Sequence, residues 1–405
     1  MQNTDVVIAG GGLAGSLAAA MLGRAGYSVV IVDPHRVYPP DFRCEKLDGT
    51  QKAVLMKTGI GEKVLAAGTA DEEAWVARMG HLVERRRGDQ HGILYDTLVN
   101  TVRAQIPASV SFLRSRVTGI TNSADRQTVT LGGGEIINAR LVVLANGLNN
   151  ALRQSLGFDR VVTSECHSVT IGFNVRPSKT VRFPFSSLSY YGDDPCDRIA
   201  YLTLFPVGPV MRANFMVYRD IHDPWLDMFR DEPRATMAAA MHGLEKLTGD
   251  YEVFGHVKIR PADLYETTGI ERPGVVLVGD AFATSCPAAG TGAGKALNDV
   301  ERLCNEHIPN WLATPGMGEE KIATFYADPM KCAYDRHSVE KAHFLRALST
   351  EDGIAWDARR WMRFAAARVR QFRRERGLGG VMPAPANPAF AVPEPEVPPS
   401  LLKTG

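Results

Sequence analysis

Residues 6–15 read VVIAGGGLAG, and this stretch decides the fold of the chain. The apolar run predicts a strand, the glycines a tight turn, and the residues that follow a helix leading to a second strand. The G-x-G-x-x-G spacing lets backbone approach a pyrophosphate, and the helix N-terminus presents free N–H groups to it. An acidic residue ends the second strand, where it can accept hydrogen bonds from a ribose. The motif predicts a dinucleotide site, with FAD and NAD both open, formed by Gly10, Gly12, Leu13, Ala14, Gly15 and Asp33.

A second glycine-rich segment follows a buried strand two-thirds of the way along the chain, and residues 279–293 read GDAFATSCPAAGTGA. It resembles the second FAD fingerprint of the aromatic-hydroxylase-type flavoprotein monooxygenases, the family of para-hydroxybenzoate hydroxylase. The resemblance implies non-covalent FAD, with Asp280 on the ribityl chain and Pro287 beside the isoalloxazine. It also implies that a helix start faces the pyrimidine carbonyl, formed by Gly290, Thr291, Gly292 and Ala293. A helix N-terminus there would stabilise the negative charge of reduced flavin.

Two further segments are similar to patterns of this family. Residues 141–153 read LVVLANGLNNALR and resemble its Asp-Gly motif, with Asn146 in place of the aspartate and Asn150 in place of a serine. The amide of Asn146 keeps the hydrogen-bonding geometry but lacks the carboxylate, and the alternative for this segment is a purely structural role. Arg43 matches the place where many family members put an arginine on the FAD pyrophosphate; a surface charge is the alternative there.

Composition limits the classes of function. The 405 residues include 46 basic and 45 acidic ones, so the overall charge predicts no nucleic-acid binding. The six cysteines and the dispersed histidines lack metal-ligand spacing, and we expect no metal site. The first strand begins too early for a cleavable leader, and the longest apolar run, residues 13–22, is too short to span a bilayer. We therefore expect a cytoplasmic protein.

The predicted architecture is α/β: a Rossmann-like FAD-binding domain of the glutathione-reductase and hydroxylase type, an inserted β-sheet substrate domain and a helical C-terminal extension. The FAD-binding domain is discontinuous and takes in residues 1–72, 90–165 and 255–307. Residues 73–89 and 166–254 form the β-rich substrate domain, since their polarity alternates as in strands. Residues 308–376 are predicted to be helical, and residues 377–405, rich in proline, to be disordered.

The last predicted helix, Trp356 to Arg376, contains eight arginines and an apolar stripe of Trp361, Ala365, Val369 and Phe372. Such a helix suits peripheral contact with an anionic membrane or a partner protein. The alternative is a solvated basic face whose stripe packs on the protein's own FAD domain. The oligomeric state is open.

By the family resemblance, the function is that of an FAD-dependent monooxygenase that uses NAD(P)H and O₂, through a flavin C4a-hydroperoxide, on an aromatic, quinol or other lipophilic small molecule. The flavin supplies the chemistry, so no protein nucleophile is expected. One alternative is a flavin-dependent prenyl or quinone reductase of the geranylgeranyl-reductase-like type, and another is a non-catalytic flavin-domain scaffold. Four aromatic residues at strand spacing are candidates to line the substrate pocket or to pack in the core: Tyr190, Tyr201, Phe215 and Tyr218.

Overall fold

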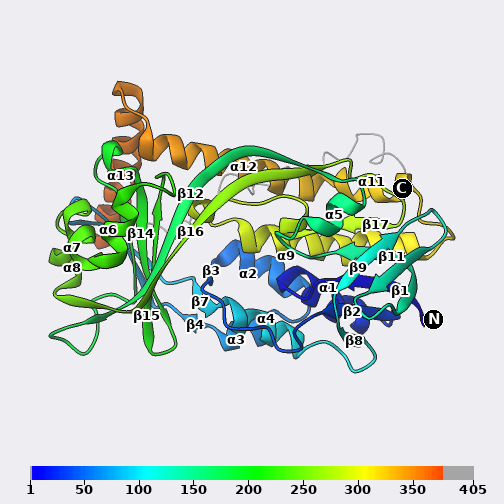
Figure 1. The fold of residues 1–405 in the computed structure, drawn as a ribbon. Coiled ribbons are helices and arrows are strands. Elements are labelled where there is room, and N and C mark those ends of the chain that lie inside the picture. Colours follow the sequence, from blue (N-terminus) through cyan, green and yellow to red (C-terminus); the bar gives the residue numbers. More distant parts are fainter. Residues whose placement is uncertain (1, 377–405) are drawn as a thin grey trace, which may run out of the picture.

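A seven-stranded sheet, parallel at its centre, organises the N-terminal part of the chain (Figure 1). The computed structural model describes residues 2–376. The strands of this first sheet run in the order β8, β2, β1, β11, β10, β9, and β17 pairs with the C-terminal half of β11. Their bounds are β1 (Gln2–Ala9), β2 (Val29–Asp33), β8 (Ser111–Arg114), β9 (Val117–Thr121), β10 (Gln127–Leu131), β11 (Ile136–Leu144) and β17 (Val275–Leu277).

Helices cover both faces of the first sheet, and for this reason its central strands are apolar on both sides. Val6 and Ile8 of β1 face one helical layer, whereas Val7 faces the opposite side. The first layer contains α1 (Leu13–Arg24), α2 (Gly49–Lys57), α3 (Gly61–Ala67), α4 (Tyr95–Arg103), α9 (Gly292–Arg302), α10 (Ile308–Leu312) and α11 (Glu319–Tyr326). On the other side lies the short α5 (Ala151–Ser155), and apolar residues of β9 and β10, the strands that extend the sheet beyond β11, belong to the same core cluster.

A second seven-stranded sheet, in the order β16, β12, β15, β14, β13, β5, β6, lies beside the first. One face packs on three helices, α6 (Pro224–Asp231), α7 (Pro233–Ala240) and α8 (Leu244–Thr248). Its strands are β5 (Glu73–Arg78), β6 (His81–Arg87), β12 (Asp159–Pro177), β13 (Ser187–Tyr191), β14 (Ile199–Val207), β15 (Val210–Val217) and β16 (Tyr251–Thr268). Figure 1 shows the long β12–β16 pair running from this sheet back towards α5 and the first sheet. A small sheet of β3 (Cys44–Leu47), β4 (Thr69–Ala70) and β7 (His91–Leu94) lies between them.

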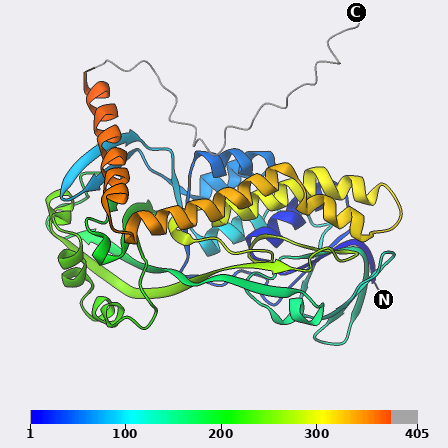
Figure 2. The same cartoon turned by 90° about the horizontal axis from the view of Figure 1, so that it is seen from above.

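Two long helices complete the described residues. α12 (Pro329–Thr350) packs on α9 and on the cavity side of the second sheet, and α13 (Ile354–Glu375) follows it. Figure 2 shows α13 at the end of the molecule formed by the second sheet, far from the N-terminus. Within residues 2–376 no helix combines the length and the apolar character that crossing a bilayer requires. The predicted disorder of 377–405 concerns residues outside those described.

α13 covers the edge strand β6. Gln371 accepts a hydrogen bond from the backbone N–H of Arg85 at 2.9 Å, and Arg368 donates to the carbonyl of Leu82 at 2.8 Å. Ala367, on the same face of α13, packs with residues of β5 and β6. The alternative in which the apolar stripe packs on the FAD domain is therefore wrong, because the helix packs through a different face and on the second sheet.

Candidate flavin and substrate site

A cavity of about 860 Å³ separates the carboxyl ends of the first sheet's strands from the second sheet. Gly15 and Thr291 are not among its lining residues, since Gly15 packs on Gly10 and the Thr291 hydroxyl bonds to Ser338. The other predicted site residues line it: Gly10, Gly12, Leu13, Ala14, Asp33, Arg43, Asn146, Asp280, Pro287, Gly290, Gly292 and Ala293. The motifs from three distant parts of the chain therefore meet at one cavity.

The glycine turn after β1 has room for no side chain at two positions. A Cβ on Gly10, whose φ is +105°, would come 2.5 Å from the carbonyl oxygen of Ala145. A Cβ on Gly15 would lie 1.9 Å from the carbonyl oxygen of Gly10. Asp33 accepts a hydrogen bond from the N–H of Gly11 at 2.7 Å, so its carboxylate supports the turn directly. A carboxylate has about four lone-pair sites, so this bond leaves acceptor capacity for a ribose.

Arg103 of α4 contacts the same turn, and none of the sequence motifs includes this residue. Its Nε donates to the carbonyl oxygen of Gly11 at 3.0 Å, and its guanidinium lies 3.4 Å from the Asp33 carboxylate. The only signal in the sequence is an arginine on a helix whose opposite residues are apolar. Its position behind the glycine turn follows from tertiary packing.

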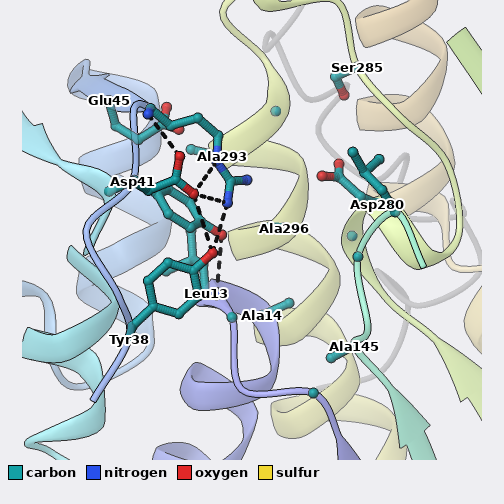
Figure 3. A pocket seen from close by; sticks show the side chains of 18 of the residues that line it. Leu13, Ala14, Tyr38, Asp41, Glu45, Ala145, Asp280, Ser285, Ala293 and Ala296 are labelled. Carbon is teal, nitrogen blue, oxygen red and sulfur yellow. Dashed lines mark hydrogen bonds and ion pairs between the residues drawn. The ribbon is translucent and has the colours of Figure 1, made fainter. Parts of the chain in front are cut away.

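Arg43 lies in a cluster next to the glycine turn, on the wall that faces Asp280. Its guanidinium stacks 3.7 Å from the centroid of the Tyr95 ring and bonds to the Asp41 carboxylate at 2.8 Å and the Tyr38 hydroxyl at 2.9 Å. Figure 3 shows Tyr38, Asp41 and Glu45 on the side of the cavity facing Asp280. These contacts orient Arg43, and a guanidinium held in place suits bidentate contact with a phosphate.

Asp280 follows β17 and is held by a buried network beneath it. Burial raises the pKa of Asp280, and nearby Arg43 opposes that rise. The preceding residue, Gly279, donates its N–H to Asp299 of α9 at 2.8 Å. Asp299 also lies 3.2 Å from the Lys295 ammonium and 3.4 Å from that of Lys331.

Asp335 closes this network, 3.0 Å from Lys295 and 2.6 Å from Lys331. Two lysines and two aspartates of α9 and α12 thus neutralise one another beside the Asp280 loop, and they fix the start of α9 relative to α12. Buried charges are tolerated when they are paired in this way.

The Asn146 turn contacts the same loop through Arg153, which is fully buried. The Arg153 guanidinium donates to the carbonyl oxygen of Ala281 at 2.5 Å and to the Thr267 hydroxyl at 3.2 Å. Asn146 donates to the carbonyl of Asn149 at 3.0 Å, and its Oδ1 is buried with no hydrogen-bond partner among the described residues. A buried acceptor at the cavity wall is suited to a ligand donor.

The start of α9 forms the wall below Pro287. Gln51 of α2 donates to the carbonyl of Gly290 at 3.0 Å, and Gly290 adopts φ +65° with open space where a side chain would be. Tyr201 lines the cavity and donates to the carbonyl of Ala288 at 2.5 Å. The other three aromatic candidates, Tyr190, Phe215 and Tyr218, are buried in core clusters and do not line it.

These residues fit a flavin dinucleotide. The glycine turn and the N-terminus of α1 would take the pyrophosphate, Asp33 the ribose, and Asp280 the ribityl chain. FAD supplies electron transfer and oxygen activation when bound. The protein's own part is to orient the dinucleotide, to present the N-terminus of α9 and to exclude water. Among the described residues no cluster of His, Cys, Asp and Glu could hold a metal ion.

Comparisons with known proteins agree with this geometry. The sequence model of the FAD binding domain family matches residues 3–308. The 3-demethoxyubiquinol 3-hydroxylase of Escherichia coli is 24% identical over 330 residues, which are 75% of this chain and 79% of the relative. The dialkyldecalin synthase of Streptomyces rugosporus is 25% identical over 374 residues, 86% of this chain and 77% of the relative.

Among solved structures, the p-nitrophenol 4-monooxygenase of Pseudomonas putida shares the fold, with a TM-score of 0.73 at 17% identity over 91% of this chain and 94% of that one. The chain therefore belongs to the FAD binding domain family, as an FAD-dependent oxidoreductase of the aromatic-hydroxylase type.

Proposed function

We propose that this FAD-dependent hydroxylase uses NAD(P)H and O₂ to hydroxylate an aromatic or quinol-type small molecule. The observation that carries the proposal is the continuity of the cavity. One end is formed by the glycine turn and Asp280, and the other by apolar and hydroxyl side chains of the second sheet and the loop before β3. The lining residues of this substrate end are Phe42, Thr170, Tyr201, Thr203, Phe205, Asn214 and Met216.

The arrangement suits oxygen insertion because it needs no acid–base dyad or nucleophile, only a ring held beside Pro287 in a water-poor cavity. Relatives named 3-demethoxyubiquinol 3-hydroxylase, squalene monooxygenase and 6-hydroxynicotinate 3-monooxygenase support the choice of a ring or a lipophilic substrate. One relative is named as a synthase and not as a monooxygenase. The measurement that distinguishes the two kinds of activity is therefore the consumption of O₂.

The experiment follows NAD(P)H and O₂ consumption by the FAD-loaded protein across phenols, quinols and isoprenoids. We expect one ring substrate to stimulate both, with one labelled oxygen atom from ¹⁸O₂ in the product. Substrate reduction without O₂ would identify a prenyl or quinone reductase. Product formation without NAD(P)H or O₂ would identify a synthase, and no stimulation by any ring would contradict the proposal.

We further infer that α13 lies on an anionic membrane surface. The face of α13 that points away from β6 is apolar and exposed: Trp361 is 60% exposed, Met362 63%, Val369 54% and Phe372 48%. Arg359 and Arg373 are exposed on the same helix, and Arg376 is exposed directly after its last residue. Such apolar side chains can insert at the boundary between headgroups and acyl chains, and the arginines beside them are attracted to anionic headgroups.

Flotation with vesicles of phosphatidylglycerol tests this surface. We expect binding at low salt that weakens at high salt, and loss of binding in a Trp361→Ser, Phe372→Ser variant. The matched control is Val181→Ser, which removes an exposed apolar residue from the loop between β12 and β13. Equal flotation of both variants, or none by the wild type, would refute a membrane role for α13.

A further inference from the structure

The substrate end of the cavity contains a lysine that forms no hydrogen bond and no ion pair with the residues that the structure describes. Lys46 is on β3 and lines the cavity beside Phe205, with its Nζ 6.0 Å from the centroid of that ring. Among residues 2–376 the ammonium of Lys46 forms no hydrogen bond and no ion pair. Burying an ammonium without such a partner costs free energy, because the protein does not replace the hydrogen bonds that water would make to it.

The surroundings of Lys46 do not neutralise its charge. Burial, with a smaller contribution from Lys341, lowers the pKa of Lys46 to about 8, although Asp71 and Asp48 act in the opposite direction from beyond ion-pair distance. Arg43, another basic side chain that lines the cavity, is by contrast paired with Asp41.

The neighbouring polar groups of the substrate end are already engaged with one another. The Thr170 hydroxyl donates to the Met216 sulfur at 3.3 Å, and the Thr203 hydroxyl donates to the carbonyl of Asn214 at 3.3 Å. Phe42 and Phe205 supply apolar wall. Such a wall accepts a flat ring, and the ammonium of Lys46 is a cation with three donors that the protein leaves for a ligand.

We propose that Lys46 is a specificity-determining residue that binds an ionised oxygen carried by the aromatic ring of the substrate, either a phenolate or a carboxylate. This proposal rests on the proposed function, since it assigns the ring to the substrate end of the same cavity. The ionised oxygen provides the charge-assisted hydrogen bond that the protein does not, and it orients the ring relative to Pro287. A neutral ring of the same shape lacks this interaction.

A rival role for Lys46 is contact with the flavin. That role predicts weaker FAD retention or an altered flavin spectrum when the ammonium is removed, with the choice among ligands unchanged. The two roles are therefore separable by measuring ligand binding and FAD retention in the same variants.

The test is equilibrium dialysis of the FAD-loaded protein, without NAD(P)H, against three probes of similar shape: 4-nitrophenol in its ionised form, 4-nitrobenzoate and the neutral 4-nitroanisole. The variants are Lys46→Met and Lys46→Gln, which remove the charge, and Lys46→Arg, which keeps it. Lys57→Met, at an exposed lysine of α2, is the matched control. Thermal melting identifies any variant that does not fold.

We expect the wild type and Lys57→Met to bind one anion more tightly than 4-nitroanisole. The neutral variants should lose on the order of 10-fold in affinity for that anion and none for 4-nitroanisole, and Lys46→Arg should retain the preference. The anion that is favoured separates phenolate from carboxylate.

Unchanged anion preference in the neutral variants, or a loss confined to FAD retention, would overturn the proposal, as would a wild type that binds no probe at millimolar concentration. The outcome is distinct from that of the proposed function, because binding is measured without turnover. Anion preference without substrate-stimulated O₂ consumption would leave the Lys46 site standing and the monooxygenase proposal refuted.

Discussion

Arg153 donates a hydrogen bond to the backbone carbonyl of Ala281 at 2.5 Å, so the segment after the Asn146 turn holds the loop that bears Asp280. We predict that Arg153→Met weakens FAD retention on the order of 10-fold and lowers the melting temperature, because it removes the charged donor from the buried carbonyl of Ala281 and leaves only the neutral Thr267 hydroxyl as its side-chain donor among the described residues. The matched control is Arg160→Met, since Arg160 stacks on the same Tyr265 ring but makes no bond to the Asp280 loop. Equal FAD retention in the two variants, measured by ultrafiltration, would contradict this role.

Asp280→Ala should weaken FAD retention more than Asn146→Ala. A carboxylate on ribityl hydroxyls makes charge-assisted bonds of about 1.5–3 kcal/mol, against about 0.5–1.5 kcal/mol for those of a neutral amide. Fluorescence titration of the apoprotein with FAD measures both constants. A third variant, Asn146→Asp, introduces a carboxylate at this position. Faster flavin reduction by NAD(P)H in that variant would show that the amide of Asn146 affects the rate of the reductive step. Identical FAD constants for the two alanine variants would exclude the assignment of Asp280.

Gly15→Ala should abolish FAD binding and destabilise the fold, because its new Cβ would meet the Gly10 carbonyl at 1.9 Å. Overpacking of this kind costs about 1–3 kcal/mol or more, and it displaces the turn. Gly119→Ala on β9 is the control, since its nearest heavy atom is 3.8 Å away. Urea unfolding checks both, and a wild-type midpoint for Gly15→Ala would show that the turn can adapt.

Asp299→Asn should destabilise the protein by about 3–5 kcal/mol, because two buried lysines would then share the single carboxylate of Asp335. An exposed pair provides the comparison: Glu252→Gln removes the partner of Arg176 and should cost less than about 1 kcal/mol. Denaturant unfolding measures the difference between the two variants. A similar loss in both would mean that the network of α9 and α12 contributes no more than a surface ion pair.

The buried His167 should make stability fall in mild acid. Burial lowers its pKa to about 4, while its Nδ1 lies 3.1 Å from the Ser164 hydroxyl. The neutral ring is therefore favoured in the folded state, and the unfolded chain takes up the extra proton. The contribution of the neutral His167 ring to the free energy of unfolding is fully present above about pH 6.5, and it is lost as the pH falls towards about 4.

Unfolding midpoints at pH 7 and pH 5 test this, with His167→Gln expected to flatten the decline and exposed His81→Gln to leave it unchanged. An equal decline in all three proteins would place the acid sensitivity elsewhere.

The first βαβ unit and the Asp280 loop were predictable because glycine spacing and strand–turn–helix order are local properties of the chain. Arg103, Asp41 and the lysine–aspartate network were not, because each acts across elements far apart in sequence. Tyr201 was distinguished from the core residue Phe215 only by the side of the sheet each one faces, and strand register decides that side. For α13, the sequence pattern located the apolar stripe, but it did not predict which face of the helix packs on β6.

The bonds from α13 to β6 also have a consequence for aggregation. An uncovered edge strand is a template for pairing with another chain, and the groups of β6 that bond to Gln371 and Arg368 would become such a template if α13 were removed. A chain shortened before Ile354 should therefore self-associate through β6 even where its flavin site is intact. Detachment of α13 in order to bind lipid would uncover the same groups of β6, so we expect α13 to contact a vesicle while still packed on the sheet, through its outward side chains alone.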